Sequence, residues 1–559
     1  MEIVVAESAD GVHLSPWQPG ADQPAEVVPR EELAARVLEL EADGPRWVWA
    51  DTAATYPDLL ARGVRVARAH DLTLCRTILG RAVGAPPDAD SWEVPDAASP
   101  DAPPTLFESF PMAPSQVLDE YRRQREGLAT APARGRLAAL LAAESAGALA
   151  AAEMRHDGMP WSRHEHDRLL TDLLGPRPYP GAVPVALVGL AAQVRAALDA
   201  PRLNVDSPTE LLRALRSAGV EARTTRTWEL REIDHPAIAP LLTYKKLSRL
   251  HTANGWAWSD AWVLPGPGAR ERVHPDFVPG GVVTGRWATR GGGALQLPKA
   301  VRAAMVADPG WRLVVADAAQ LEPRVLAAMS RDPRMADAGR GTDLYQGLVD
   351  TGVVDTRAHA KVAMLGALYG ATTGEAGELV PRLVRAFPRA LAAVEDAARI
   401  GEAGGVVRTW LGRTSPPPAG TWDVVQRRAS EQDATEEDRR RAGRQSRDWG
   451  RFTRNFIVQG TAAEWALCWI AELRGRLRTL AAPVADGAAG EVAGAVATGP
   501  HLVLFLHDEV VVHTPAHLAE EVAAAVREAA ASAGRLLFGS FPVDFPLDVH
   551  VVDHYGAAD

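Results

Sequence analysis

Apolar and polar positions alternate in short blocks over the N-terminal part of the chain. Residues 2–5 and 47–49 form apolar runs of strand length, whereas residues 31–40 and 59–66 repeat their apolar positions at the interval of a helix. Strands that alternate with helices predict a small α/β unit. From residue 115 to residue 155 the spacing becomes helical and Ala-rich, which predicts a helix that leads into a second unit.

Two stretches lack this periodicity. Residues 82–114 are rich in Pro, Ala and Asp, and we interpret them as a loop or linker. Residues 481–498 are almost featureless and predict a flexible surface insertion. Between these stretches, residues 150–280 mix helical patterns with Trp-rich connectors.

The C-terminal half carries two strand patterns that end at acidic residues. Residues 312–316 form an apolar strand that ends at Asp317, and a helical pattern that carries Glu322 and Arg324 follows. Further on, the segment HLVLFLHDEVVVHT has two apolar runs on either side of three polar residues. This segment predicts a tight β-hairpin with Asp508 at the turn.

Composition narrows the class of protein. The chain has 559 residues, which is enough for about three or four domain-sized units, and a formal net charge of −11. Its two cysteines, Cys75 and Cys468, exclude a disulfide framework and a thiolate zinc site and are typical of the reducing cytoplasm. The start MEIVVAESAD lacks the pattern of a signal peptide, and no run of about 18 uncharged apolar residues predicts a membrane span. Without a Gly-rich phosphate loop or a dinucleotide motif, an NTPase or a dehydrogenase is not indicated.

Asp317 and Asp508 are candidates for a metal site. Two carboxylates on adjacent strands can bridge two divalent cations about 4 Å apart, which activate a hydroxyl nucleophile and stabilise the leaving oxygen of a phosphoryl transfer. Magnesium suits such oxygen ligands. Either acid taken alone is more simply a turn residue or a solvated strand end, so the prediction depends on the pair.

The pattern over residues 355–370 predicts a helix with cations on one face. Arg357, Lys361, Leu365 and Tyr369 follow one another at intervals of four. Arg and Lys one turn apart can clamp a polyphosphate, and the Lys can donate a proton to a leaving pyrophosphate. The alternative is a solvated Arg/Lys edge beside a core Tyr.

A second basic face is predicted for the segment EEDRRRAGRQSRDWGRFTRN. Its arginines recur at intervals of four, three, four and three, namely Arg440, Arg444, Arg447, Arg451 and Arg454. Such a face can follow a phosphate backbone, and because the net charge is negative, nucleic-acid binding has to come from local stripes of this kind. The face continues to the amides of Asn455 and Gln459, which can bond base edges in a minor groove. Acidic residues 436–438 also allow ordinary salt bridges along an exposed helix.

Together these motifs resemble the family A DNA polymerases, of the bacterial DNA polymerase I type. The resemblance rests on DAAQLEPRVLAAMS, RAHAKVAMLGALYG and LHDEVVVH in this order, with TGRW upstream and NFIVQGTAAE between the last two. Weaker similarity extends over most of the chain, where LAAAEMRHDGMPW and NVDSPTELLRAL are similar to the family's thumb. No 5′-nuclease domain is expected before these segments.

The resemblance implies a multidomain fold of the α/β and α+β classes. Residues 1–145 would form an RNase H-like domain of the 3′-5′ exonuclease type, and the rest a right-hand polymerase with an antiparallel palm sheet and mainly helical fingers and thumb. Residues 146–283 would form the thumb and residues 331–415 the fingers. Residues 284–330 and 416–559 would form the two parts of the palm.

For the chemistry, the resemblance makes Asp317 and Asp508 the two metal-binding aspartates, with Glu509 beside them. The implied cofactor is a pair of Mg²⁺ ions, and the implied substrates are deoxynucleoside triphosphates. Arg357 and Lys361 would grip the triphosphate, with Lys361 as the candidate general acid.

For substrate selection, the resemblance assigns Glu322 to the exclusion of ribonucleotides at the sugar 2′ position. It assigns Tyr369 to the base of the nucleotide pocket. Contacts to the primer-template near the new base pair would come from Arg286, Arg451, Asn455, Gln459 and His507. The stripe arginines Arg440, Arg444 and Arg447 would extend this DNA contact.

Three positions depart from the family pattern. Leu365 stands where the family has an aromatic residue, Ala318 where a tyrosine follows the first aspartate, and Tyr345 where a histidine helps to hold the phosphates. Since base stacking on an aromatic ring contributes roughly 1 to 3 kcal/mol, we expect a modest polymerase of the repair or damage-tolerant kind.

The N-terminal domain lacks an evident cluster of acids for exonuclease chemistry. Asp51 follows an apolar strand, but Ala53 stands where the second acid would be, and the stretch with Asp58 fits another motif of the family only poorly. Asp71 lies in a segment that resembles a structural part of the family. We therefore expect a scaffold, with proofreading through Asp51, Asp58 or Asp71 as the alternative. A DNA-binding protein on a polymerase scaffold that has lost synthesis is the rival from another class.

The expected setting follows from the same resemblance. The partner would be primer-template DNA in replication or repair, the chain would act as a monomer away from any membrane, and it would lie in the cytoplasm at the nucleoid.

Overall fold

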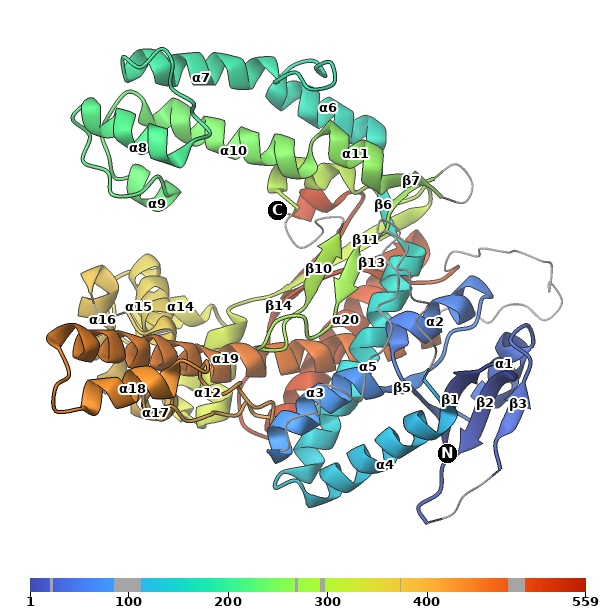
Figure 1. Cartoon of the computed structure of the whole chain (residues 1–559). Coiled ribbons are helices and arrows are strands. Elements are labelled where there is room, and N and C mark those ends of the chain that lie inside the picture. The colour runs from blue at the N-terminus through green and yellow to red at the C-terminus, as the bar shows by residue number, and fades with distance from the viewer. Residues whose placement is uncertain are drawn as a thin grey trace. The chain divides into compact units, whose positions relative to one another are not determined.

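The computed structural model describes residues 1–20, 24–84, 112–266, 270–291, 297–371, 373–480 and 498–558. The chain divides into two compact units (Figure 1). The first unit comprises Met1–Asp157, Asp276–Thr289 and Val314–Val551, and the second comprises Gly158–Pro275, Arg290–Leu313 and Val552–Asp559. The expected linker at residues 82–114 and the expected insertion at residues 481–498 lie outside the described residues except at their ends.

The first unit begins with a five-stranded sheet in the order β3-β2-β1-β4-β5. β1 pairs antiparallel with β2 and parallel with β4, which in turn pairs parallel with β5. The strands predicted at residues 2–5 and 47–49 are confirmed as β1 and β4. The bounds are β1 (Glu2–Ser8), β2 (Gly11–Pro16), β3 (Glu26–Val28), β4 (Arg46–Trp49) and β5 (Arg68–Asp71).

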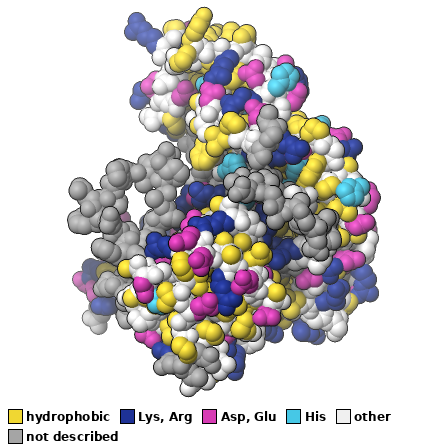
Figure 2. Space-filling view, turned by 90° about the vertical axis from the view of Figure 1, so that its right-hand side faces the viewer, with side chains coloured by type: hydrophobic (Ala, Val, Ile, Leu, Met, Phe, Trp, Pro, Cys, Tyr) yellow, Lys and Arg dark blue, Asp and Glu magenta, His cyan; other side chains and the backbone are white. Residues whose placement is uncertain are grey.

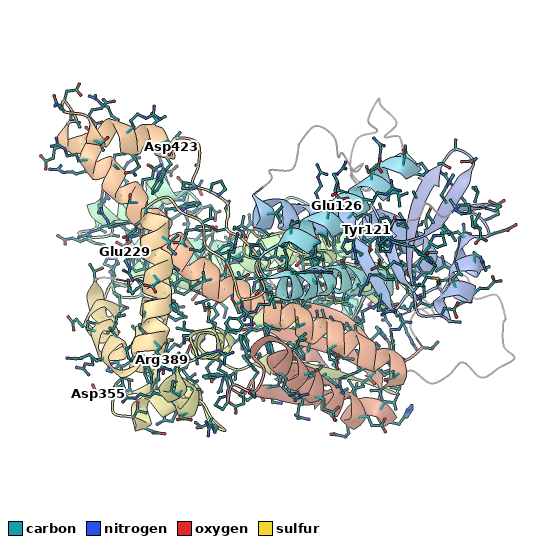
Figure 3. All side chains as sticks on the ribbon, turned by 90° about the horizontal axis from the view of Figure 1, so that it is seen from below. Tyr121, Glu126, Glu229, Asp355, Arg389 and Asp423 are labelled. Atoms are coloured by element: carbon teal, nitrogen blue, oxygen red, sulfur yellow. The ribbon has the colours of Figure 1, made fainter. Side chains whose placement is uncertain are left out.

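Helices cover both faces of this sheet, because successive side chains of β1 point to opposite sides. Ile3 and Val5 pack into a core with Leu149, whereas Val4 lies with Tyr121 on the other face. Figure 3 labels Tyr121 on the helix α4 that covers this second face. The helices are α1 (Leu33–Glu41), α2 (Thr52–Ala61), α3 (Leu72–Val83), α4 (Pro114–Thr130) and α5 (Arg134–Asp157).

Two helix predictions need correction here. The helix expected at residues 59–66 is α2, which begins earlier because Asp51 caps its first turn and ends before Gly63, where φ is +77°. The single helix expected at residues 115–155 is two helices. Ala131 adopts an extended conformation (φ −65°, ψ 137°) because it precedes Pro132, and the chain restarts as α5.

α5 is a core helix of the first unit. It is long and apolar enough to cross a membrane by length and composition, but 67% of its most apolar window is buried inside the protein. It packs against α2, β5 and the long helix α19 (Glu436–Leu480). α5 also runs through the boundary expected at residues 145 and 146, so the second unit begins at Gly158 instead, where φ is +72°.

The second unit is mainly helical around one apolar core that includes Leu170, Leu215, Leu241 and Val301. A three-stranded sheet in the order β6-β8-β7 accompanies it. Its helices are α6 (Arg163–Leu174), α7 (Val185–Ala197), α8 (Pro208–Ser217), α9 (Thr227–Leu230), α10 (Ile238–Asn254), α11 (Trp256–Trp262), η3 (Lys299–Ala304) and η5 (Tyr555–Ala558). Its strands are β6 (Met159–Trp161), β7 (Val263–Pro265) and β8 (Glu271–Val273).

The rest of the first unit surrounds a four-stranded sheet in the order β12-β13-β11-β14. The strands are β11 (Trp311–Ala318), β12 (His501–Leu506), β13 (Glu509–Pro515) and β14 (Leu547–Val552), with β9 (Asp276–Val278) and β10 (Ala288–Gly291) as a separate pair. The helices are α12 (Leu321–Ser330), α13 (Pro333–Ala338), α14 (Leu344–Asp350), α15 (Arg357–Tyr369), α16 (Gly374–Ala386), α17 (Pro388–Glu402), α18 (Trp422–Ser430), α19, η4 (Ala516–Leu518) and α20 (Ala519–Phe538).

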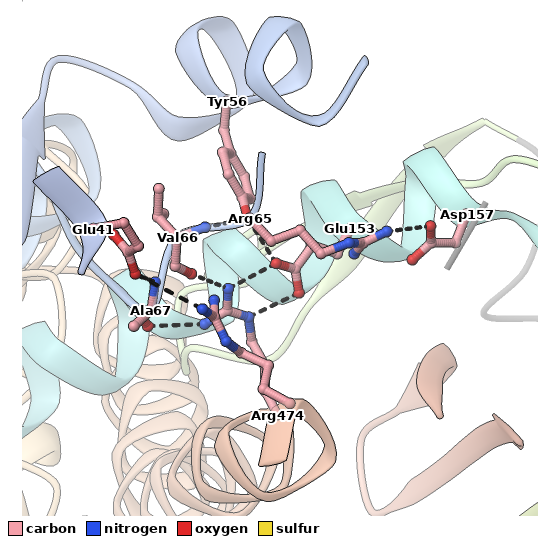
Figure 4. A network of polar contacts seen from close by, with 9 residues as sticks. Glu41, Tyr56, Arg65, Val66, Ala67, Glu153, Asp157 and Arg474 are labelled. Carbon is pink, nitrogen blue, oxygen red and sulfur yellow. Dashed lines mark hydrogen bonds and ion pairs between the residues drawn. The ribbon is translucent and has the colours of Figure 1, made fainter. Parts of the chain in front are cut away.

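A buried polar network joins the N-terminal sheet region to the C-terminal part of α19 (Figure 4). Arg474 is 5% exposed and donates to both carboxylate oxygens of Glu153 on α5, at 2.8 and 2.7 Å. It also donates to the carbonyls of Val66 and Ala67 at 2.5 and 2.9 Å, and Tyr56 on α2 donates to Glu153 at 2.7 Å. Arg474 and the other donors hold the pKa of Glu153 at about 2 despite its burial.

Candidate active site

Asp317 and Asp508 lie on neighbouring strands of the four-stranded sheet. β11 extends through Asp317, and the β12-β13 hairpin turns at His507 and Asp508 with His507 in the left-handed region at φ +57°. The backbone N–H of Ala318 donates to the carbonyl of Asp508 at 2.8 Å, which brings the two strand ends together. The predicted strand and the predicted hairpin are confirmed.

The carboxylate of Asp508 lies in a crowded acidic environment. Burial, together with the charges of Glu509 and Glu322, raises its pKa to about 6, although the charge of Arg286 opposes this rise. A bound cation would relieve this repulsion, and oxygen ligands of this kind fit Mg²⁺. Within the described ranges, no group of three or more His, Cys, Asp or Glu side chains is arranged to hold a metal by itself. Two carboxylates would thus need substrate oxygens to complete the coordination.

Glu322 lies at the start of α12 in contact with two other predicted site residues. Arg286 forms an ion pair with Glu322 at 2.5 Å, and the Tyr369 hydroxyl donates to the other carboxylate oxygen at 3.4 Å. Burial and the charge of Glu322 raise the pKa of Tyr369. The structure therefore brings Arg286, Glu322 and Tyr369 into one cluster.

α15 carries the predicted cations, and the helix expected at residues 355–370 is confirmed. Thr356 caps it by accepting from the backbone N–H of His359 at 3.1 Å. Arg357 forms an ion pair with Asp343 at 2.7 Å. Lys361 is exposed, and its ammonium group has no hydrogen-bond or ion-pair partner among the described residues. Leu365, one turn further, is half-buried.

Asp343 is a site residue that the motif analysis missed. Its carboxylate caps α14 through the backbone N–H of Gln346 at 2.9 Å and also binds Arg357. Burial, together with the charges of Glu322 and Asp343, raises the pKa of Tyr345 to about 12, and the guanidinium of Arg357 lies 5.6 Å from the ring of Tyr345. The only signal in the sequence was an acid at a helix start, which is too common to single out.

The arginine stripe is exposed on α19 but is shorter than expected. Arg440, Arg444, Arg447 and Arg451 are exposed, whereas Arg454 is 7% exposed. Arg454 donates to the carbonyl of Ala367 at 2.7 Å and pairs with Glu395. The three-residue step from Arg451 turns this side chain toward the packed side of the helix.

Ordinary salt bridges account for part of this stripe. Arg440 pairs with Glu436, and Arg451 pairs with Asp448. Arg444 and Arg447 have no such partner in the part of the chain that the structure describes.

The amides and the histidine near the hairpin differ in exposure. Asn455 and Gln459 are half-buried, and the Oδ1 atom of Asn455 is buried without a hydrogen-bond partner in the described parts of the chain. His507 is exposed at the hairpin turn, and desolvation together with the charge of Arg286 lowers its pKa.

The N-terminal acids serve as helix caps. Asp51 accepts from the backbone N–H groups of Ala53 and Ala54 at 2.6 and 3.1 Å. Asp71 is buried and accepts from the N–H groups of Thr52 and Leu74 at 2.8 and 2.9 Å.

Asp51 and Asp71 are close enough to repel each other. Burial and the charge of Asp51 raise the pKa of Asp71 to about 7. Asp58 is exposed on α2, and no hydrogen bond or ion pair joins it to either acid within the described ranges.

Comparisons with known proteins agree with the motif order. Residues 186–556 match the model of the family described as DNA polymerase family A. The thermostable DNA polymerase I of Thermus filiformis is 29% identical over 346 residues, which cover 57% of this chain and 36% of that protein. The DNA polymerase I of Chloroflexus aurantiacus is 27% identical over 360 residues, which cover 60% of this chain and 34% of that protein. The chain thus spans about a third of the length of these relatives.

A solved structure shares the fold. It is the POL domain of Pol1 from M. smegmatis in complex with DNA primer-template and dNTP, with a TM-score of 0.68 and 17% identity, covering 100% of this chain and 96% of that chain. This similarity agrees with the helix-dominated mixture of helices and sheets described above. With its residues 186–556 matched over the strands and helices that carry both aspartates, the chain belongs to DNA polymerase family A.

Proposed function

We propose that this chain is a template-directed DNA polymerase that adds deoxynucleotides to a primer 3′ end, in DNA repair or replication. The observation that carries the proposal is the placement of Asp317 and Asp508 on neighbouring strands, joined by the hydrogen bond from Ala318 to Asp508. Family membership supports it, because both acids lie inside the matched residues.

Asp317 and Asp508, with Glu509 beside them, would hold two magnesium ions. When bound, these ions favour the deprotonated primer hydroxyl and stabilise the leaving oxygen. The raised pKa of Asp508 makes its carboxylate responsive to a cation, because a nearby positive charge favours the ionised form.

Arg357 and Lys361 would bind the triphosphate. The ammonium of Lys361 has no ion-pair partner among the described residues and can bind a phosphate directly, while Arg357 has to exchange Asp343 for phosphate oxygens. Lys361 would protonate the leaving pyrophosphate, which is the role of a general acid. Tyr345 and Leu365 would line the same pocket in place of the histidine and the aromatic residue of the family pattern.

Glu322 would select the sugar of the incoming nucleotide. Its carboxylate is fixed by Arg286 and Tyr369, so it cannot swing away without breaking both contacts. A fixed side chain at the 2′ position excludes the additional hydroxyl of a ribonucleotide.

Primer-template DNA is the proposed partner. The exposed arginines of α19 would bind phosphates, while Asn455, Gln459 and His507 would contact the minor groove near the new base pair. The solved structure with the same fold was determined with primer-template DNA and dNTP, which supports this assignment. We further propose that the chain acts as a monomer in the cytoplasm.

In this proposal the four-stranded sheet is the palm, residues 331–415 are the fingers and Gly158–Pro275 is the thumb. The strand order β3-β2-β1-β4-β5 supports an RNase H-like N-terminal domain. Because Asp51 and Asp71 cap helices and Asp58 stands apart, we propose that this domain is a scaffold without proofreading activity.

A labelled-primer gel tests the proposal against its two rivals. With magnesium and the four deoxynucleotides, the primer should lengthen; without nucleotides, it should stay intact. Shortening that survives Asp508→Ala and is lost in Asp51→Ala would establish a nuclease in the N-terminal domain. A primer that stays unchanged in every lane, although it binds, would leave a DNA-binding scaffold.

A further inference from the structure

The loop that carries Arg286 is the segment between β9 and β10. It contains two glycines in the left-handed region, Gly280 with φ +62° and Gly285 with φ +89°. Two backbone hydrogen bonds hold it together, from the N–H of Val282 to the carbonyl of Arg286 at 3.0 Å and from the N–H of Gly285 to the carbonyl of Val282 at 2.7 Å. The side chain of Arg286, which pairs with Glu322, therefore depends on the position of this loop.

A buried ion pair contacts this loop at both glycines. Arg413 donates to Glu144 on α5 at 2.6 Å, and the two side chains are 10% and 1% exposed. A first side-chain carbon at Gly285 would lie 2.6 to 2.9 Å from three atoms of the Arg413 guanidinium. One at Gly280 would lie 2.5 Å from the Glu144 carboxylate. The pair thus lies directly against the backbone of the loop, at positions where only glycine leaves room for it.

The same side of α5 also contacts Trp287, the residue after Arg286. Gly147 lies three positions after Glu144 and therefore on the same face of the helix. A carbon added at Gly147 would lie 3.3 Å from the ring of Trp287, which is 2% exposed. Leu149 of α5 instead belongs to the core of the N-terminal sheet. α5 thus connects the core of the N-terminal domain with the residues on either side of Arg286.

The Glu144–Arg413 pair differs from the ion pairs of the surface. Figure 2 shows basic and acidic side chains interspersed on one face of the molecule, where water weakens their attraction. Glu144 and Arg413 are shielded from water, and the Nε atom of Arg413 has no hydrogen-bond partner among the described residues. Without the Glu144 charge, the guanidinium would be a buried cation that has lost its carboxylate and has to move toward water or another acceptor. Such a movement displaces Gly285, because the guanidinium lies against it.

We infer that Glu144 is a positioning residue for the selection of the sugar. Through Arg413 it holds the loop in place, the loop fixes Arg286, and Arg286 fixes the carboxylate of Glu322. The N-terminal domain thereby takes part in synthesis without any nuclease chemistry. This role rests on the proposed function, in which Glu322 excludes ribonucleotides.

Incorporation of dCTP and of CTP opposite a template guanine, by the full chain with magnesium, measures this selection. Glu144→Gln keeps the size of the side chain and removes its charge. The ratio of kcat/KM for dCTP to that for CTP should fall about tenfold, because a displacement of about 1 Å in a positioned group can cost about 100-fold in rate. Glu144→Gln/Arg413→Met removes both buried charges and should fold where the single variant is too unstable. Its ratio should fall as well, because the ion pair that connects α5 to Gly285 is then absent.

Glu153→Gln is the matched control. Glu153 lies on the same helix and is the carboxylate of another buried pair, but its partners are Arg474 and Tyr56 and not residues of the loop. This variant should lose stability in urea as Glu144→Gln does, and it should keep the wild-type ratio. An equal fall of the ratio in both variants, or a wild-type ratio in folded Glu144→Gln, would overturn the inference.

Hydrogen exchange followed by mass spectrometry tests the loop without requiring catalysis. The amide hydrogens of Val282 and Gly285 are bonded within the loop, so peptides that cover residues 280–287 should exchange faster in Glu144→Gln than in the wild type or in Glu153→Gln. Equal exchange in all three proteins would overturn the inference. Failure of the wild type to extend a primer would overturn the proposed function and, with it, sugar selection by Glu322, whereas the exchange result would still decide whether Glu144 holds the loop.

Discussion

Lys361 and Arg357 lie one turn apart on α15 but differ in their ion-pair partners. Arg357 is bound to Asp343, whereas the ammonium of Lys361 has no partner in the described part of the chain. As the proposed general acid, Lys361 has to approach the triphosphate and donate a proton, and the lack of a partner favours this. Arg357 would only bind negative charge, so it can exchange the carboxylate of Asp343 for a phosphate.

Substitution of Lys361 should therefore affect the rate more than the affinity. We expect Lys361→Ala to lower kcat about 100-fold, which is the usual contribution of a general acid. Lys361→Arg keeps the charge but cannot donate a proton at neutral pH, so it should stay slow. Steady-state kinetics with Arg357→Gln as the comparison should show mainly a raised KM for that variant, and full activity of Lys361→Arg would contradict the assignment.

Glu464, a buried residue of α19, gives a prediction about pH and stability. It accepts from the Thr409 hydroxyl and from the backbone N–H of Leu411 at 2.8 Å, and burial raises its pKa to about 7. Because the pKa in the folded state lies above the ordinary 4.5, its contribution to stability is complete below pH 4.5 and is lost as the pH rises to about 7. The loss amounts to about 3 kcal/mol.

Chemical denaturation at several pH values measures this loss. From pH 4.5 to pH 8, the unfolding free energy of the wild type should fall by about 3 kcal/mol relative to that of Glu464→Gln. Glu472→Gln, which removes a partly exposed acid from the same helix, controls for the loss of one carboxylate. A pH-independent difference for Glu464→Gln would show that burial does not raise the pKa of this carboxyl.

At the scale of elements, patterns predicted the site better than its surroundings. The strand before Asp317 and the hairpin around Asp508 were predictable, because short apolar runs that end at polar residues leave few other structures. Pro132 indicates the break between α4 and α5. The prediction missed it because the Ala-rich pattern continues on both sides of this proline. The cap by Asp51 shifted α2 to an earlier start than its apolar residues indicated.

The buried polar network at the C-terminal part of α19 was not predictable, since Arg474 and Glu153 are 321 positions apart. Removal of Arg474 leaves a buried carboxylate without its cation, so Arg474→Met should destabilise the fold by about 3–5 kcal/mol. Urea denaturation measures this change. Arg476→Met, which breaks a partly exposed pair with Glu528, should cost less than about 1 kcal/mol.

A second substitution distinguishes an unpaired charge from lost packing. Arg474→Met/Glu153→Gln removes both charges and should recover part of the stability. If the double variant is no more stable than Arg474→Met, the network contributes through shape and not through charge.

The exposed stripe of α19 gives a prediction for duplex binding. Arg444→Gln/Arg447→Gln removes two side chains that have no ion-pair partner in the described ranges, so the salt slope of primer-template binding should fall by about 1.8, at about 0.9 per contact. Arg439→Gln/Arg441→Gln removes the same charge from positions of the helix off the stripe. Equal slopes for both double variants in anisotropy titrations would mean that the stripe does not follow the phosphate backbone.

For the whole molecule, the order of motifs was more informative than any single property. A net charge of −11 gave no indication of a DNA partner, because only local arginines matter at contact distance. The motif order predicted the family that the comparison establishes for residues 186–556. Residues that act through distant contacts, such as Asp343 on Arg357 and Glu395 on Arg454, could not be predicted because the sequence does not show which side chains meet.

The central claim is that Asp317 and Asp508 carry nucleotidyl transfer. The most direct measurement is the rate of single-nucleotide incorporation by rapid quench, with enzyme in excess over labelled primer-template, for wild type, Asp508→Ala and Asp548→Ala. Asp548 lies exposed on β14 of the same sheet, so its variant controls for the loss of an acid. We predict that Asp508→Ala binds the primer-template but incorporates nucleotide at least about 1000-fold more slowly, while Asp548→Ala matches the wild type. Incorporation by Asp508→Ala at a rate close to that of the wild type would contradict the account.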